Sequence, residues 1–315
     1  MSLQFGPYVL CGWKVFSDME LPELSAWSAT VPKEQTLRIQ FGALPDTGEI
    51  SHFAVTEEED VLLRVPGVAG FHLHAAEHRV TIQMEGSSDP LLVRNFLYGS
   101  VLAVLCYKRG LFPLHGASVL LNGSAVILSG PSGSGKSTLA TALARRGHPL
   151  LCDDVCAIDT KVPGRPLLWP AFPRVKLLAD AISNFELGAA MTYSRAASGT
   201  KGHFGMTAFS STAVVSCPVP VAAVYALESP SGDKVERSLQ KGKDAFLLLD
   251  SQAHRGWMGR NLGLHGQLFR HITALASSVP VYLLRRPRVL ERLDETANLL
   301  ETAHHDQPVI AGSKS

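Results

Sequence analysis

The chain has 315 residues, of which 46% are hydrophobic and 18% are charged. This composition is typical of a globular protein of one large or two ordinary domains, and it excludes an intrinsically disordered chain. A net charge of only +1 argues against a uniformly basic polyanion binder, although residues 1–90 carry −8 and residues 91–315 carry +9. We therefore expect an acidic front piece and a basic body suited to an anionic ligand. The alternative is that two surfaces of opposite charge simply attract each other.

The cysteines and the apolar runs indicate in which cellular compartment the protein is expected. Five scattered cysteines without a CxxC pair favour reduced thiols over a disulfide framework. The first residues show no secretory pattern, and no uninterrupted apolar stretch reaches the roughly 20 residues that a membrane helix needs. The best candidate, residues 96–106, contains Gly99 and Ser100. We therefore expect a soluble cytoplasmic protein with neither a membrane nor a nucleic acid as partner.

The first part of the chain, residues 1–88, predicts an acidic, β-rich domain. Short apolar runs separated by glycine, proline and acidic clusters indicate strands at 8–15, 37–41, 61–65 and 80–84. His72 and His74 fall two residues apart, on one face of a strand. Two such histidines could begin a metal site, but no third ligand stands at a telling spacing. We interpret them as part of a surface strand.

A helix is predicted directly after this domain. Asp89 is a good N-cap residue, Pro90 suits the first helical position, and Gly110 is a plausible stop. Because the intervening residues are apolar on most faces, the helix should be buried and should join the two domains. The predicted boundaries are 1–88 for the first domain, 89–303 for the second and 304–315 for a flexible tail.

The second domain alternates between strands and helices, which predicts an α/β fold. We expect strands at 112–121, 124–129, 221–228 and 279–284, and one or two strands within 149–159. Helices are expected at 137–146, 265–277 and 288–301, with a strand–helix unit near 234–250. The segment Met191–Met206 has three glycines, two cations and few apolar residues, which predicts a mobile lid over phosphates.

A phosphate-binding motif occupies residues 130–137, whose sequence GPSGSGKS fits GxxxxGK[ST] between a predicted strand and a predicted helix. Glycines let backbone N–H groups point at phosphate oxygens, and the helix N-terminus favours an anion. Lys136 would reach the β- and γ-phosphates, with its charge solvated before nucleotide arrives, and Ser137 would ligate Mg²⁺. This predicts ATP and Mg²⁺ as cofactors. The expected nucleotide contacts are Gly130, Ser132, Gly133, Ser134, Gly135, Lys136, Ser137 and Thr138.

Two consecutive carboxylates follow the motif. Asp153 and Asp154 end a short apolar strand at 17 and 18 residues beyond Lys136, where a carboxylate can bind Mg²⁺ or accept a proton from a hydroxyl. Consecutive strand residues point to opposite faces, so we expect one of them to carry the proton transfer. His115 lies on the predicted strand 112–121, which precedes the strand that leads into the motif, and a histidine there more often packs than reacts.

Taken together, these residues resemble the kinase domain of HPr kinase/phosphorylase. The resemblance rests on His115-Gly116, the motif at 130–137, Arg146-Gly147-His148 and Asp153-Asp154; it is strong over residues 110–160 and extends in outline to 300. It implies a P-loop fold of the HPr kinase and PEP carboxykinase type. It implies that Asp154 is the base for an acceptor serine and that His115 and Lys136 help to hold the transferred phosphate.

The sequence also departs from that family. The family has a Mg²⁺-binding glutamate ahead of an arginine downstream of the aspartates, whereas residues 172–176 read FPRVK, with Arg174 and no glutamate. We expect Arg174 to be a catalytic residue and Asp153 or water to be the second Mg²⁺ ligand. The opening YVLCGWKVFSDMELPEL looks like that of HPr-kinase-like enzymes found with ribosomally made peptides, such as the lasso-peptide precursor kinases. The expected partner is therefore a peptide or small protein with an acceptor serine, and a homo-oligomer is possible.

The leading hypothesis is an ATP-dependent serine kinase of a peptide or small protein. An HPr-type kinase/phosphorylase and a small-molecule kinase of the shikimate or gluconate type are alternatives within the enzymes. A nucleotide sensor that uses the phosphate loop as a switch is the alternative without catalysis.

Overall fold

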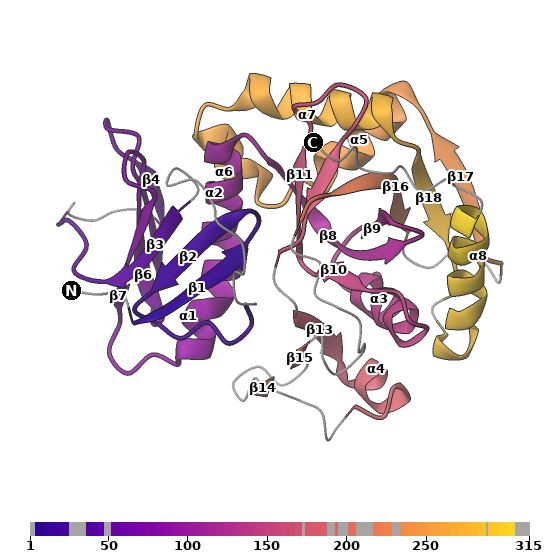
Figure 1. Ribbon diagram of the computed structural model, residues 1–315, viewed down its shortest axis with the longest axis horizontal. Helices are drawn as coiled ribbons and strands as arrows, with labels where there is room; N and C mark the ends of the chain where they lie inside the picture. The colour runs from indigo at the N-terminus through magenta and orange to yellow at the C-terminus, as the bar shows by residue number, and fades with distance from the viewer. Residues whose placement is uncertain are drawn as a thin grey trace. The chain divides into compact units, whose positions relative to one another are not determined.

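The computed structural model describes residues 4–24, 36–46, 52–171, 174–187, 193–194, 201–205, 217–228, 234–287 and 289–305. These residues divide into two compact units (Figure 1). Unit 1 consists of the described parts of residues 1–110 together with Trp257–His265, and unit 2 of the described parts of 111–256 and 266–315.

Unit 1 is built on a seven-stranded mixed sheet with the strand order β1-β2-β3-β7-β6-β5-β4. The predicted run at 8–15 is two strands, because Cys11 and Gly12 both take positive φ angles, of 46° and 77°, and turn the chain between them. The strands are β1 (Phe5–Leu10), β2 (Trp13–Ser17), β3 (Thr36–Phe41), β4 (Phe53–Val55), β5 (Val61–Val65), β6 (Ala69–His74) and β7 (Arg79–Met84).

The predicted helix follows this sheet as α1 (Pro90–Phe96), a π-helical turn (Leu97–Val101) and α2 (Leu102–Arg109). Asp89 caps it by accepting a hydrogen bond from the N–H of Leu91 at 2.8 Å, and Gly110 ends it with a φ of 74°. The run Pro90–Arg109 is long and apolar enough to cross a membrane by length and composition, contrary to the sequence prediction, but 72% of its apolar window is buried. Such burial is what the core helix of a folded unit shows.

The division between the units lies at Gly110 rather than at the predicted residue 88. An ion pair explains why the helix stays with the N-terminal sheet. Arg94 donates from Nε to Oε1 of Glu23 at 2.9 Å, and the Tyr98 hydroxyl donates to Oε2 at 3.1 Å. Because the Glu23 side chain is only 1% exposed, separating it from these donors would leave a buried charge unpaired.

Unit 2 contains an eight-stranded mixed sheet, which together with its helices confirms the predicted mixed α/β class. In this sheet β9 pairs antiparallel with β8 and parallel with β16. The strands are β8 (Phe112–Leu121), β9 (Ser124–Ser129), β10 (Leu150–Cys152), β11 (Val155–Asp159), β12 (Leu167–Trp169), β16 (Val219–Leu227), β17 (Glu236–Gln240) and β18 (Val281–Arg285). The helices are α3 (Lys136–Arg145), α4 (Ala179–Asn184), α5 (Gly242–Ser251), α6 (Gly256–Asn261, mostly in unit 1), α7 (His265–Ser278) and α8 (Leu293–His305), with a 3₁₀ turn at Leu290–Arg292.

A separate three-stranded sheet corrects part of the predicted lid. It consists of β13 (Arg174–Leu178), β15 (Lys201–Gly205) and β14 (Tyr193–Ser194), and it pairs Leu178 with Lys201. Residues 201–205 are therefore strand rather than loop. Residues 193–194 of the predicted lid are likewise strand, and its other residues, 191–192, 195–200 and 206, lie outside the described part of the chain.

The predicted tail is also corrected at its start. His304 is the penultimate residue of α8 and only 3% exposed, and its Nε2 lies 3.0 Å from the hydroxyl of Tyr225. Residues 306–315 lie outside the described residues.

The turn after α3 ties that helix to α8. Arg146 donates to Asp294 at 3.0 Å and from Nε to Glu301 at 3.0 Å, while His148 lies 2.8 Å from Glu301. Burial alone would raise the pKa of Glu301, but the hydrogen bonds from His148 and Arg146 hold it below its ordinary value. Arg146 and His148, which contribute to the family resemblance, thus serve here to dock α8 against α3.

The Glu301 contacts predict a pH-dependent contribution to stability. A carboxyl group whose pKa is lower in the folded than in the unfolded protein stabilises the folded state at pH values above its unfolded pKa, which is about 4.3 for glutamate. This stabilisation is lost as the pH falls through the pKa of the folded state. Glu301→Gln should therefore cost about 1 kcal/mol at pH 7 and less at pH 3.5, measured by urea unfolding. Glu295→Gln, which breaks an exposed pair between α8 and Arg292 of the preceding 3₁₀ turn, is the control and should cost less. An equal cost of Glu301→Gln at both pH values would contradict this assignment.

Candidate active site

The glycine-rich segment forms a loop between β9 and α3, and the helix begins at Lys136. At Gly130 the φ angle is 131°, and a Cβ there would lie 2.6 Å from the backbone oxygen of Leu227. Only glycine fits this approach of loop and strand. The loop therefore brings its backbone and the first turn of α3 to the same place, which is an arrangement that suits an anion.

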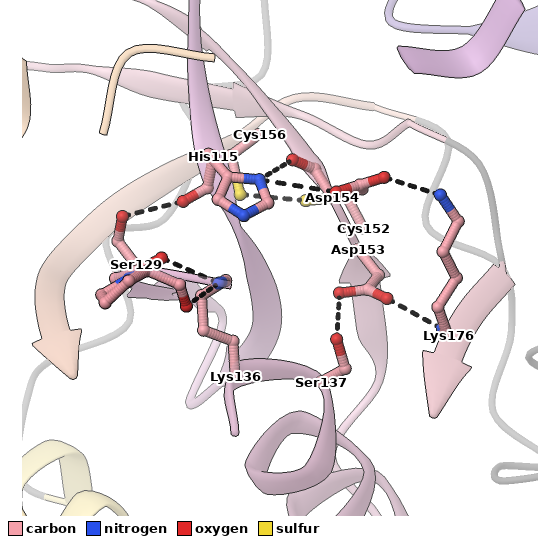
Figure 2. A network of polar contacts seen from close by, with 11 residues as sticks. His115, Ser129, Lys136, Ser137, Cys152, Asp153, Asp154, Cys156 and Lys176 are labelled. Atoms are coloured by element: carbon pink, nitrogen blue, oxygen red, sulfur yellow. Dashed lines mark hydrogen bonds and ion pairs between the residues drawn. The ribbon is translucent and has the colours of Figure 1, made fainter. Parts of the chain in front are cut away.

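Lys136 is held by the loop itself. Its Nζ donates to the backbone oxygens of Gly130 at 2.8 Å and Pro131 at 2.9 Å, and the residue is only 7% exposed (Figure 2). The expectation that its charge is solvated is therefore wrong, because loop carbonyls take the place of water. An incoming phosphate would have to replace these carbonyls as the partner of the ammonium group.

Asp153 and Asp154 form the link between β10 and β11, and both side chains line the same pocket. The prediction that they point to opposite faces is wrong. Asp154 has a φ of 78°, so the chain leaves extended geometry at this residue and alternation no longer applies. Non-glycine residues seldom take such angles, and those that do concentrate at functional sites.

Asp153 sits between the helix and the small sheet. Its Oδ1 accepts from the Ser137 hydroxyl at 2.8 Å, and its Oδ2 accepts from the backbone N–H of Lys176 at 3.0 Å. The residue is 3% exposed, and burial together with the charge of Asp154 raises its pKa. The two predicted Mg²⁺ ligands, Ser137 and Asp153, are thus in direct contact.

Asp154 contacts a lysine and a histidine (Figure 2). Its Oδ2 accepts from Nζ of Lys176 at 2.8 Å, and Nδ1 of His115 lies 3.4 Å from its Oδ1. Burial would raise the pKa of Asp154, but Lys176 and the neighbouring histidines hold it well below its ordinary value. The carboxylate is therefore ionised at neutral pH.

The tautomer of His115 follows from its contacts. Its Nδ1 lies 3.0 Å from the backbone oxygen of Asp154, and a carbonyl oxygen can only accept. Burial and the charge of Lys136 lower the pKa of the ring, so it is neutral at pH 7. With the proton on Nδ1, the lone pair is on Nε2.

The structure brings most of the predicted site residues together. The same pocket is lined by His115, Ser132, Gly133, Gly135, Lys136, Ser137, Thr138, Asp153 and Asp154. Gly130 and Ser134 belong to the loop but do not line this pocket. Neither does Arg174, which is buried at the start of β13 and only 1% exposed.

Three residues that the sequence interpretation did not assign lie in or next to this site. Lys176 pairs with Asp154 across 22 residues of chain. The ring of His254 lies 5.6 Å from that of His115, and burial lowers the pKa of His254 to about 4. Arg286 follows β18 and donates to the backbone oxygen of Ser134 at 3.3 Å. Only Lys176 carried a signal, because it stands two residues after Arg174 in the segment that resembles a family signature.

Comparisons with known proteins find local similarity. The chain is 49% identical over 47 residues to an HPr kinase/phosphorylase of Pelodictyon phaeoclathratiforme, covering 15% of this chain and 14% of that protein. It is 36% identical over 89 residues to the Bacillus pumilus HPr kinase/phosphorylase, covering 26% of this chain and 29% of that protein. The matches thus span less than a third of the relatives' length, and no family model matches the chain.

Among solved structures, the HPr(Ser) kinase/phosphatase from Coxiella burnetii aligns with 61% of this chain and 95% of its own. The TM-score is 0.34 and the sequence identity 15%.

The contact between Lys176 and Asp154 makes a prediction about pKa. Burial raises the pKa of Asp154, and the charge of Lys176 is the main effect that lowers it. In Lys176→Met only the effect of burial keeps its full size, so the pKa of this carboxyl should rise above that in the wild type. The measurement is the pH dependence of the ¹³Cγ shift of Asp154, assigned with Asp154→Asn. Lys243→Met, at an exposed position on α5, is the control. An unchanged Asp154 titration in Lys176→Met would show that Lys176 does not set this pKa.

Proposed function

We propose that the chain is an ATP- and Mg²⁺-dependent kinase that transfers the γ-phosphate to a serine hydroxyl of a peptide or small protein. The observation that carries the proposal is the meeting of Asp154, His115 and Lys136 with the Ser137–Asp153 contact in one pocket. The local similarity to HPr kinase/phosphorylases supports the same reaction class.

Binding of ATP would use the loop and the start of α3. Backbone N–H groups of the loop and the helix N-terminus would receive the phosphates, and Lys136 would exchange its two carbonyl partners for phosphate oxygens. The hydroxyl of Ser137 and the carboxylate of Asp153 are oxygen ligands of the kind that Mg²⁺ prefers, so these residues fit the ion. When bound, Mg²⁺ would neutralise part of the charge on the phosphates.

Asp154 is the candidate for accepting the proton of the serine hydroxyl. Its carboxylate is ionised, as a base must be, but the ion pair with Lys176 makes it weakly basic while no substrate is present. A γ-phosphate offers Lys176 a competing anion, and a lysine drawn toward it would leave Asp154 a stronger base. His115, neutral and with a lone pair on Nε2, can accept a hydrogen bond in the same pocket.

The acceptor that we favour is a serine of a lasso-peptide precursor. The sequence opening supports this, and residues 57–59 form an exposed acidic turn that can attract a basic peptide. We place the reaction in the cytoplasm, without a membrane or nucleic-acid partner. An HPr-like protein as acceptor, a small-molecule acceptor and nucleotide sensing without turnover are the outcomes that the next experiment separates.

The proposal predicts a specific loss in Asp154→Asn. Phosphoryl transfer to the peptide should fall by about 10²–10⁴, because the amide cannot accept the proton, while ATP binding persists. ATP consumption and mass spectrometry of the peptide measure the first effect, and calorimetry of a non-hydrolysable ATP analogue measures the second. Asp244→Asn, at an exposed position in the first turn of α5, is the matched control and should leave both unchanged.

The alternative results of these activity and binding assays each identify a different function. Turnover that is indifferent to added peptide or HPr-like protein favours a small-molecule kinase, and phosphorylation of the HPr-like protein alone favours the HPr type. Nucleotide binding without turnover favours a sensor. Wild-type transfer by Asp154→Asn would remove Asp154 from the reaction.

The acidic turn predicts a salt-dependent effect on the peptide. Reversal of Glu57, Glu58 and Glu59 to lysine should lower kcat/KM for a basic peptide at low salt and leave KM for ATP unchanged. The difference should shrink as salt shortens the Debye length, which is about 8 Å at physiological ionic strength. A neutral peptide serves as control. Equal kcat/KM values in the variant and the wild type at low salt would contradict electrostatic attraction by this turn.

A further inference from the structure

We propose that Asp60, His72 and His74 form a binding site for a divalent transition-metal ion, with Zn²⁺ as the best fit. The site lies in unit 1 and takes no part in the phosphate-binding pocket. Among the described residues, these three side chains each offer one ligand atom, and the three atoms lie within 4.8 Å of one another.

The sheet holds the three residues together. His72 and His74 stand two apart on β6, so they share one face of the sheet. β5 pairs antiparallel with β6 and places Val61 opposite Leu73, which puts Asp60, the residue before β5, beside His74. The strand geometry therefore supplies the third ligand from 12 residues before His72.

The spacing of the ligand atoms suits a small ion. Oδ2 of Asp60 lies 2.7 Å from Nε2 of His72 and 3.5 Å from Nδ1 of His74. A tetrahedral Zn²⁺ with bonds of about 2.0 Å keeps its ligand atoms about 3.3 Å apart, so small shifts of half-buried side chains would admit it. Two imidazoles and one carboxylate leave a fourth position for water or an anion.

The protonation states also suit a metal. Nε2 of His74 lies 3.0 Å from the hydroxyl of Thr81, while its Nδ1 accepts from Nη2 of Arg79 at 3.2 Å. Nδ1 of His74 therefore carries a lone pair, and Thr81 orients the ring as an outer partner of a metal-bound histidine does. Asp60 accepts from the N–H of Ala75 at 2.8 Å, which fixes the carboxylate.

One ligand pair of the cluster shares a hydrogen. Nε2 of His72 lies 2.7 Å from Oδ2 of Asp60, and a carboxylate accepts, so the imidazole donates this hydrogen. A metal ion would take the place of the proton that Nε2 of His72 shares with Asp60.

Arg79 is the cation that a metal ion must displace. Its guanidinium donates to Nδ1 of His74 and also pairs with Glu77 at 2.9 Å, so the exposed Glu77 offers it an alternative partner. Removal of this positive charge should strengthen metal binding. An ion-pair network with a purely structural role would gain no metal affinity from that change.

The test is a Co²⁺ titration of the full chain without nucleotide, in excess Mg²⁺ so that oxygen-rich sites are occupied. The visible d–d absorption reports nitrogen coordination, and Zn²⁺ should abolish it by displacement. The wild type should bind one Co²⁺ at this site. Asp60→Asn and His72→Gln should weaken this binding by more than about 100-fold. His52→Gln, at an exposed histidine of the same unit, should leave it unchanged.

Arg79→Gln keeps the proposal testable even if a ligand variant does not fold. It should bind Co²⁺ about tenfold more tightly than the wild type or better, and Zn²⁺ should raise its Tm by more. Absence of Co²⁺ binding in both the wild type and Arg79→Gln would overturn the proposal. So would unchanged Co²⁺ affinity in folded Asp60→Asn and His72→Gln.

Discussion

The site of unit 2 depends on keeping two adjacent carboxylates in one partly buried turn. Asp153 and Asp154 repel each other, and burial penalises both charges, which is why the pKa of Asp153 is raised. Lys176 offsets the repulsion and the cost of burial at both residues. Its backbone N–H donates to Asp153, and its ammonium group donates to Asp154. Both contacts come from β13, and His115 adds a contact to the backbone oxygen of Asp154, where the chain takes a positive φ.

Helix α3 connects the carboxylate pair to the rest of unit 2. Its first turn presents Ser137 to Asp153, its apolar face packs into the core through residues such as Leu139 and Leu143, and the turn after it holds α8 through Arg146. A helix fixed at both ends and along its buried face cannot shift without disturbing the carboxylate pair. A helix held in this way would suit the phosphate site that we propose, because small displacements of reacting groups cost large factors in rate.

The sequence predicts the parts of the site that lie close together in the chain. The GPSGSGKS motif with its flanking strand and helix, the aspartate pair and the strand carrying His115 are all found where expected. Residues brought together by tertiary contacts were not predictable in the same way. Lys176 reaches Asp154 from β13, His254 follows α5, and Asp60 reaches the histidine pair through the pairing of β5 with β6. The buried Glu23–Arg94 ion pair likewise joins the helix Pro90–Arg109 to unit 1. Composition does not reveal this contact, so the boundary after Gly110 was not predicted.

The most direct test of the account is a crystal structure of the full chain with Mg²⁺ and a non-hydrolysable ATP analogue. The phosphates should lie at the start of α3, with Nζ of Lys136 moved from the oxygens of Gly130 and Pro131 to a phosphate oxygen. Mg²⁺ should lie at Ser137 and Asp153, and the γ-phosphate beside Asp154 and His115. An analogue bound elsewhere, or Lys136 still bound to the loop carbonyls beneath an occupied site, would contradict this arrangement.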